Sequence, residues 1–444
     1  MIKFMLKHKY LIVFILIIIL FIPYSLYQVP ETDKLSVITS VGLDKVEDGI
    51  QLSANTIVPN SGTMSGSGGS DGTVKTIVVK GKNVGDAFSN LSLILGKLPG
   101  LAHCDSIVIN KELMQEDVTK YLDYFVRTNN LTSNATLIVA ENTAKEIIET
   151  TASQKGLRAI TLSDVLLLNH EYVLTKKSNL DAFYANYFSK APSMALPILN
   201  VGESNQSDDS SLASGATTGS SGAESSGSSG QSQNNQSQNS GQGSGQDGNK
   251  NSSQQGGQST PSKILKNEGK GAIVNKGKLV GIIEGEQMQG LSLLSKTVKK
   301  GNVQVNNIND KIFNDATLNF DIFNKNVKSY GYFADDVPVF NYDITLVLKL
   351  EEVVMDDYSV EAMTAVKNYM KGNIKQLTES TICEDISAII NKCKSTQSDI
   401  LGVYDYFYKF HTTEWNKFLD SLEDKEDYLN YVVFTCDLKP QGKI

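Results

Sequence analysis

The chain begins with a run of apolar residues unlike anything that follows it. Lys3, Lys7 and Lys9 precede the run, and no charged residue occurs from Tyr10 to Val29. The most apolar part consists of Leu11, Ile12, Val13, Phe14, Ile15, Leu16, Ile17, Ile18, Ile19, Leu20, Phe21 and Ile22. Because a helix rises 1.5 Å per residue, about 20 apolar residues span a bilayer core of ~30 Å. The run predicts a membrane anchor within residues 1–29.

The residues that flank the run predict its orientation. Basic residues on the N-terminal side favour a cytoplasmic N-terminus, with the bulk of the chain outside the membrane, as a single-pass protein. A cleaved signal peptide is the alternative, but the expected small-x-small cleavage site is missing. A buried core helix is disfavoured because the run has no polar face.

Residues 30–201 alternate between strand-like and helix-like patterns. Short apolar strands are predicted at 35–44, 49–58, 76–80, 106–109, 135–140 and 196–201. Apolar residues at three- and four-residue spacing predict helices at 84–98, 114–126, 143–151 and 161–189. Alternation of this kind indicates an α/β sheet covered by helices, which we divide into two subdomains.

Residues 202–262 interrupt this pattern. Ser, Gly, Gln and Asn make up 47 of these 61 residues, and Leu212 is the single large apolar residue among them. Such a segment buries too little surface to offset the entropy lost on ordering, so it predicts a disordered linker. A passive tether and a binding role for the Gln/Asn tract both remain open.

The pattern resumes in residues 263–444. A hairpin is expected at 271–283, a helix at 287–297, and strands at 303–308, 317–323, 341–350 and 429–438. Residues 357–394 read as one long helix, or two with a break at Gly372 or at 378–381, and residues 404–419 read as an aromatic helix. This part is predicted to be α+β, with a mostly antiparallel sheet and long helices on one face. The whole chain is then a mixed multi-domain protein of α/β and α+β parts, with one transmembrane helix and one linker.

Composition and motifs argue against an enzyme. With 41 basic and 49 acidic residues the net charge is −8, which disfavours a nucleic-acid partner. Four cysteines are too few for a disulfide scaffold, and no Cys or His pair has metal-ligand spacing. No phosphate-binding or hydrolase motif is present, and adjacent His103 and Cys104 would point to opposite faces of an extended segment. We therefore expect no catalytic residue, no metal and no cofactor.

The aromatic segment around Trp415 allows two interpretations. Tyr404, Tyr406, Phe407, Tyr408 and Phe410 lie close to this single tryptophan in sequence. The cluster could pack as core, or it could form a docking surface, because Trp and Tyr are enriched at protein interfaces.

Several blocks together carry a resemblance. They include Gly42-Leu43-Asp44-Lys45 within residues 31–59, the Leu-rich helix and His103 within 79–109, and the hairpin and helix of 271–290. The last block is Asp399-Ile400-Leu401-Gly402, followed by Phe410, His411 and Trp415. In order and spacing, the set resembles the C subunit of GerA-type spore germinant receptors, the Ger(x)C family.

The resemblance implies a three-domain protein on the outer face of the spore inner membrane. Such subunits act with membrane A and B subunits in the response to small nutrient germinants, which this chain could meet only indirectly, and they are not known as enzymes. It also suggests Asp399, Gly402, Phe410, His411 and Trp415 as interaction residues. Two features depart from the family: no cysteine follows the apolar run to carry a lipid, and the linker is longer than expected.

Two further functions remain as alternatives to a non-catalytic receptor subunit. An anchored extracytoplasmic hydrolase of the cell envelope would need two carboxyl groups converging about 5–10 Å apart in a cleft. A purely structural scaffold would differ from a receptor subunit only in the phenotype of its loss.

Overall fold

A computed structural model describes residues 34–58, 73–128, 131, 134–153, 162, 178–204 and 262–443. The expected anchor at residues 11–22, nearly all of the expected linker, and most of the helix expected at 161–189 lie outside these residues. Within the described part of the chain, no helix is both long enough and apolar enough to cross a membrane.

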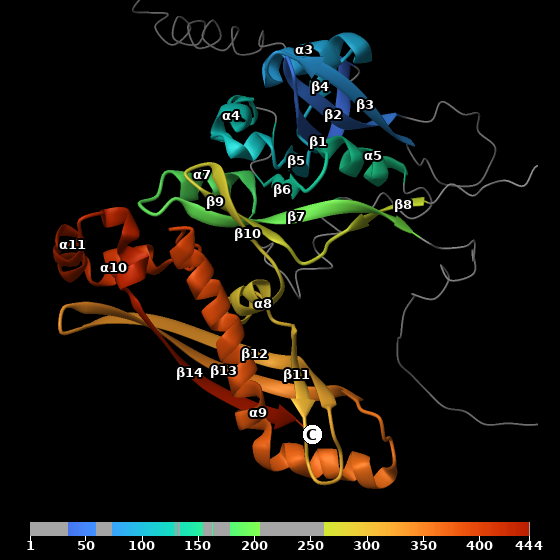
Figure 1. Cartoon of the computed structure of the whole chain (residues 1–444). Coiled ribbons are helices and arrows are strands. Elements are labelled where there is room, and N and C mark those ends of the chain that lie inside the picture. Colours follow the sequence, from blue (N-terminus) through green and yellow to red (C-terminus); the bar gives the residue numbers. More distant parts are fainter. Residues whose placement is uncertain are drawn as a thin grey trace, which may run out of the picture. The chain divides into compact units, whose positions relative to one another are not determined.

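Strands and helices alternate through the described residues (Figure 1). The strands are β1 (Leu35–Val46), β2 (Gly49–Val58), β3 (Thr73–Gly81), β4 (Leu98–Gly100), β5 (Ser106–Asn110), β6 (Thr136–Ala140), β7 (Ser193–Ser204), β8 (Ser262–Lys266), β9 (Gly271–Asn275), β10 (Lys278–Ile283), β11 (Asn302–Ile308), β12 (Ala316–Ala334), β13 (Val337–Val354) and β14 (Val433–Lys443). The helices are α3 (Val84–Leu95), α4 (Thr119–Arg127), α5 (Ala144–Ser153), α7 (Leu180–Tyr187), α8 (Gly285–Leu294), α9 (Val360–Ser395), α10 (Val403–Phe410), α11 (Thr412–Asp420) and α12 (Tyr428–Tyr431), with short 3-10 turns η2 (Leu113–Gln115) and η4 (Lys425–Asp427). The expected mixture of α/β and α+β parts is confirmed for these residues.

The first sheet has a parallel centre and antiparallel edges. Its main path runs β10-β9-β7-β6-β5-β1-β2-β3. Strands β1, β5, β6 and β7 are parallel to one another, whereas β2 and β3 form an antiparallel meander. The side chains of β5 alternate between faces, as a strand requires. Ile107 and Ile109 join the core under α3, α4 and α7, while Val108 joins a smaller core under α5.

Strands from before and after residues 205–261 build this sheet. The chain up to Val201 and the chain from Leu265 onward belong to one compact unit. Strand β9 pairs antiparallel with β7, from Ser193 opposite Asn275 to Pro197 opposite Gly271. The turn of the β9–β10 hairpin also contacts α4, because Val118 N donates to Gly277 O over 2.9 Å. The hairpin that opens the C-terminal part of the sequence is therefore hydrogen-bonded into the N-terminal sheet.

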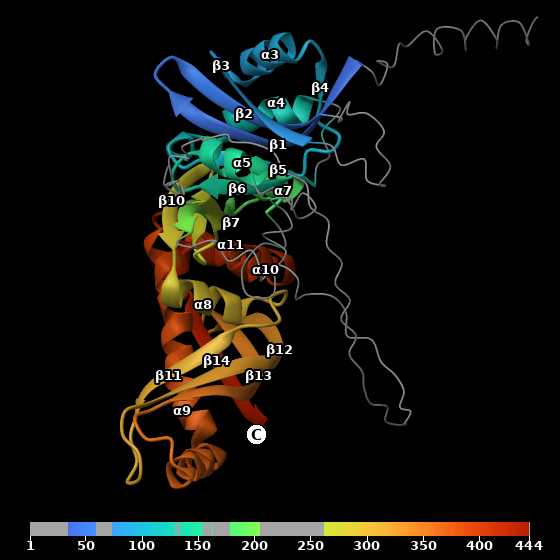
Figure 2. The ribbon, with the colours of Figure 1, turned by 90° about the vertical axis from the view of Figure 1, so that its right-hand side faces the viewer.

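The second sheet has the order β11-β12-β13-β14 and packs against α8 and α9 (Figure 2). Strands β12 and β13 have 19 and 18 residues, far longer than their apolar stretches predict. The last strand pairs parallel with β13 and begins at Val433, because the residues just before it form α12. Helix α9 is one continuous helix that changes direction after its first turns, as Figure 1 shows.

Helices α8 and α9 approach each other closely at Gly290. A Cβ atom on this glycine would overlap the main-chain carbonyl of Asp385 and lie 3.0 Å from Ile389 Cγ2. Asp385 is itself buried, and Glu286 and Glu384 are nearby acids. Burial, followed by repulsion from these two carboxylates, raises the pKa of Asp385 to about 7.

Asp385 should make stability depend on pH. Between its usual pKa near 3.8 and the folded value of about 7, the folded chain holds a proton that the unfolded chain releases. Stability therefore falls as pH rises through this window. Replacing Asp385 with Asn should raise the free energy of unfolding by about 1–3 kcal/mol at about pH 8.5, with little change at about pH 4.5.

Denaturation at the two pH values measures this effect. The variant Glu384→Gln is the matched control, since it leaves the buried carboxyl in place and should retain most of the pH slope. An Asp385→Asn variant with the slope of the parent chain would contradict the assignment.

Candidate interaction site

The five residues expected to take part in interaction lie at one place in the fold. The segment between α9 and α10 holds Asp399 and Gly402. Phe410 ends α10, Trp415 lies in α11, and His411 lies between these two helices. The aromatic helix expected at 404–419 is two helices, α10 and α11, which meet at His411.

Asp399 is buried and binds three donors. Val403 N and Tyr404 N donate to its two carboxylate oxygens over 3.0 and 2.7 Å, and the Tyr428 hydroxyl donates to Oδ2 over 2.8 Å. Burial raises the pKa of this carboxyl, although these hydrogen bonds oppose the shift. The carboxylate caps the start of α10 and ties it to α12, which is a structural role.

Gly402 permits the turn into α10. Its φ of 77° lies in the left-handed region, which residues other than glycine rarely adopt. No atom lies within 4 Å of the position that a Cβ would take, so the backbone conformation, not space, favours glycine here.

Trp415 belongs to the core. Its side chain has 0% exposure, and its indole stacks on Phe407 with ring centroids 4.9 Å apart and planes 11° apart. The rings of Tyr404 and Tyr428 meet it edge-on at 5.6 and 5.5 Å. Of the two interpretations of the aromatic segment, core packing is the one that fits this residue.

Phe410 and His411 lie nearer the surface. His411 is half-buried, with its ring 5.9 Å from that of Phe407. Phe410 is 58% exposed, and its ring lies 4.8 Å from that of Tyr406. Among the five expected residues, Phe410 is the one that offers a large apolar surface to a partner.

A second buried carboxylate lies at the carboxyl edge of the first sheet, where open α/β sheets commonly bind ligands. Asp44 accepts Ala144 N over 2.7 Å and Lys145 N over 2.8 Å, and Asn110 Nδ2 over 3.2 Å. Burial raises the pKa of the Asp44 carboxyl, although these hydrogen bonds oppose the shift. The first amides of α5, which could hold an anion, are thus already bound by the chain's own side chain.

Gly42 explains why α5 can come so near β1. A Cβ on this glycine would lie 2.9 Å from Ile148 Cγ1 and 3.1 Å from Ala144 Cβ. Sequence reasoning noted Gly42 and Asp44 as a motif without assigning them a role. The available signal was an acid at the end of a buried strand, which suits a cap for a neighbouring helix.

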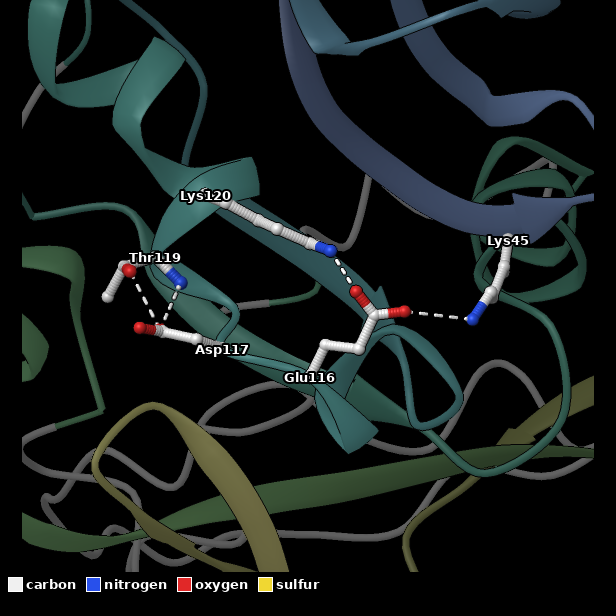
Figure 3. A network of polar contacts seen from close by, with 5 residues as sticks. All are labelled: Lys45, Glu116, Asp117, Thr119 and Lys120. Atoms are coloured by element: carbon white, nitrogen blue, oxygen red, sulfur yellow. Dashed lines mark hydrogen bonds and ion pairs between the residues drawn. The ribbon is translucent and has the colours of Figure 1, made fainter.

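A network of polar side chains includes Lys45, which directly follows Asp44 in β1 (Figure 3). Glu116 bridges Lys45 and Lys120, and these two lysines lower the pKa of Glu116 to about 2. Next to it, Asp117 accepts Thr119 N and Oγ1 over 3.0 and 2.7 Å, which caps α4. Glu116 is ion-paired with both lysines, and Asp117 is hydrogen-bonded within the chain, so both carboxylates have structural partners.

The Cys104 thiol lies inside the fold. Cys104 is buried, and burial raises the pKa of its thiol to about 12, which keeps it protonated at neutral pH. In the part of the chain that is described, His, Cys, Asp and Glu side chains do not gather in groups of three or more that could hold a metal ion.

Comparison with known families decides the identity. Residues 28–201 match the family described as Spore germination protein N-terminal domain, and residues 269–432 match Spore germination B3/GerAC like, C-terminal. The chain belongs to the GerAC family of spore germination proteins. These matches confirm the resemblance to the Ger(x)C family that the sequence blocks carry.

Two other comparisons add no further family to this assignment. The crystal structure of the GerBC protein is similar at 15% sequence identity, with a TM-score of 0.43, over 91% of this chain and 97% of that one. No curated protein matches the chain.

Proposed function

We propose that this chain is the non-catalytic C subunit of a nutrient germinant receptor, held in the spore inner membrane by the apolar helix at residues 11–22. Its N-terminus is cytoplasmic, its folded part is extracytoplasmic, and it works by contact with the membrane A and B subunits. The single observation that carries the proposal is the pair of family matches, which together include both folded parts.

Two features of the chain support the finer points. The apolar run has the length of a membrane span and is not followed by a cysteine that could be lipidated, since the first cysteine is Cys104. The buried carboxylates Asp44 and Asp399 each cap a helix, so neither is free to act as a general acid or base. A role in contact rather than in chemistry fits both features.

Removal of the anchor tests the proposal. A variant in which a cleavable secretory signal replaces residues 1–29 should leave the membrane fraction, and spores that carry it should respond poorly to nutrients. The matched control replaces residues 11–22 with leucines, which keeps a membrane span and should keep both membrane location and response.

Co-purification tests the partners. The full chain, solubilised from membranes in mild detergent, should bring down multi-span A-type and B-type subunits. In a strain without a second receptor of this type, spores that lack the chain and still respond normally to every nutrient would refute the proposal.

A further inference from the structure

One end of the first sheet collects large apolar side chains that face solvent. Strand β1 starts there at Leu35, opposite Leu98 of β4, and β2 ends there at Val58. Helix α3 follows β3 and returns to the same end, where Leu93 is 81% and Ile94 is 64% exposed. We call this surface the Leu93 face, and it consists of Ile57, Val58, Leu93, Ile94 and Leu98, all exposed.

The fold does not require these side chains to be apolar. Helix α3 packs on the sheet through Val84, Ala87, Phe88 and Leu91. With 3.6 residues per turn, Leu93 lies roughly 180° around the helix from Val84. It therefore points away from the core, and a patch of several exposed Leu, Ile and Val side chains typically marks a contact surface.

The Leu93 face lies close to the apolar run in the sequence. Five residues, 30–34, separate Val29 from Leu35. At 3.3–3.6 Å per residue, this connection reaches at most roughly 20 Å, even when fully extended. A chain whose membrane span includes the whole uncharged run up to Val29 must therefore keep the start of β1, and Leu98 beside it, near the membrane surface.

Two exposed lysines accompany the Leu93 face. Lys75 and Lys97 are exposed at the end with the Leu93 face, where ammonium groups suit lipid phosphates. Lys45 marks the opposite end of β1, where it joins the ion-paired network with Glu116 that Figure 3 shows. Exposed apolar side chains beside ammonium groups are typical of a surface that rests on a bilayer.

We infer that the Leu93 face inserts into the headgroup region of the bilayer and so fixes how the folded part stands on the membrane. The inference rests on the proposed anchor. Side chains of this kind enter the interface by about 5–10 Å, and each gains free energy from its buried apolar area. The occupant is the lipid surface itself.

Fluorescence of an added tryptophan tests the inference in the full chain. Ile94→Trp introduces a second indole into a chain that has one tryptophan, Trp415. Because Trp415 is buried, its emission gives a constant background. The chain is reconstituted in vesicles of phosphatidylcholine and phosphatidylglycerol, with and without doxyl-labelled lipid. The matched control is Val360→Trp, at an exposed apolar position on α9.

The expected result is a blue shift and loss of most of the emission of the indole at position 94 with labelled lipid, and no change at position 360. Flotation of the vesicles is measured in parallel and reports on the anchor alone. Leu93→Trp provides a second probe if Ile94→Trp folds poorly.

Every other outcome counts against the inference. A chain that floats with the vesicles, but shows no more quenching at position 94 than at position 360, keeps its anchor and overturns the Leu93 face. If the chain does not float with the vesicles, both the proposed anchor and the lipid contact of the Leu93 face are refuted. A blue shift that requires co-reconstituted A-type and B-type subunits assigns the face to a protein partner and overturns the lipid assignment.

Discussion

Replacing Trp415 with alanine is expected to lower the free energy of unfolding by about 3–5 kcal/mol. The indole has no exposed surface and is enclosed by the rings of Phe407, Tyr404 and Tyr428. Removing it leaves a cavity and also breaks the stacking contact with Phe407, so the loss includes both burial and ring contacts. Urea denaturation followed by circular dichroism measures the change without relying on the tryptophan itself.

The variant Phe410→Ala provides the matched control for this prediction. Its ring lies in the same aromatic cluster but is 58% exposed, so the loss of stability should be well under that of Trp415→Ala. If Phe410 contacts a partner subunit, this variant should weaken co-purification while the chain stays folded. A Trp415→Ala chain as stable as the parent would contradict the placement of the indole in the core.

Replacing Gly290 with valine is expected to cost about 1–3 kcal/mol, or more if α8 cannot shift. The new side chain would overlap the carbonyl of Asp385 on the facing helix, and backbone cannot rotate aside as a flexible side chain can. The two helices would have to separate over the core that they share with the second sheet. Thermal unfolding of the full chain in detergent should show a lower Tm.

The neighbouring variant Gln289→Val separates this effect from helix propensity. Gln289 is exposed on the same helix, so the change introduces the same β-branched residue without a clash. We expect a loss of well under 1 kcal/mol there. Equal losses for the two variants would show that the close approach of α8 and α9 does not limit stability.

Local patterns predicted which elements exist better than how they pair. The apolar stripe at Val84, Ala87, Phe88, Leu91, Ile94, Leu95 and Leu98 predicted α3, because spacing along one helix depends only on nearby residues. Its last part was wrong, since α3 ends at Leu95 and both Ile94 and Leu98 are exposed. The length of β12 and β13 was missed because polar residues interrupt the apolar pattern in their outer parts, such as Lys325 in β12 and Glu351 and Glu352 in β13. These strands extend by backbone pairing with each other, which a pattern of single residues does not encode.

The candidate site shows the same limit. The order and spacing of several blocks, the last of which contains Asp399, Gly402 and Trp415, suggested the family, and the family matches confirmed it. Their roles depend on partners that are distant in sequence, such as Tyr428 for Asp399. From the sequence alone, the helix-capping Asp399 and the core residue Trp415 cannot be told from residues that bind a partner.

The pairing of β9 with β7 has a consequence for the long polar segment between them. Since both of its ends are hydrogen-bonded into one sheet, the segment is an insertion into a folded body, not a hinge between two. A protease cut anywhere in residues 205–261 would leave two fragments that remain associated through strand pairing. Changes in the length of the insertion should also cost little, since the entropy of closing a loop grows only with the logarithm of its length.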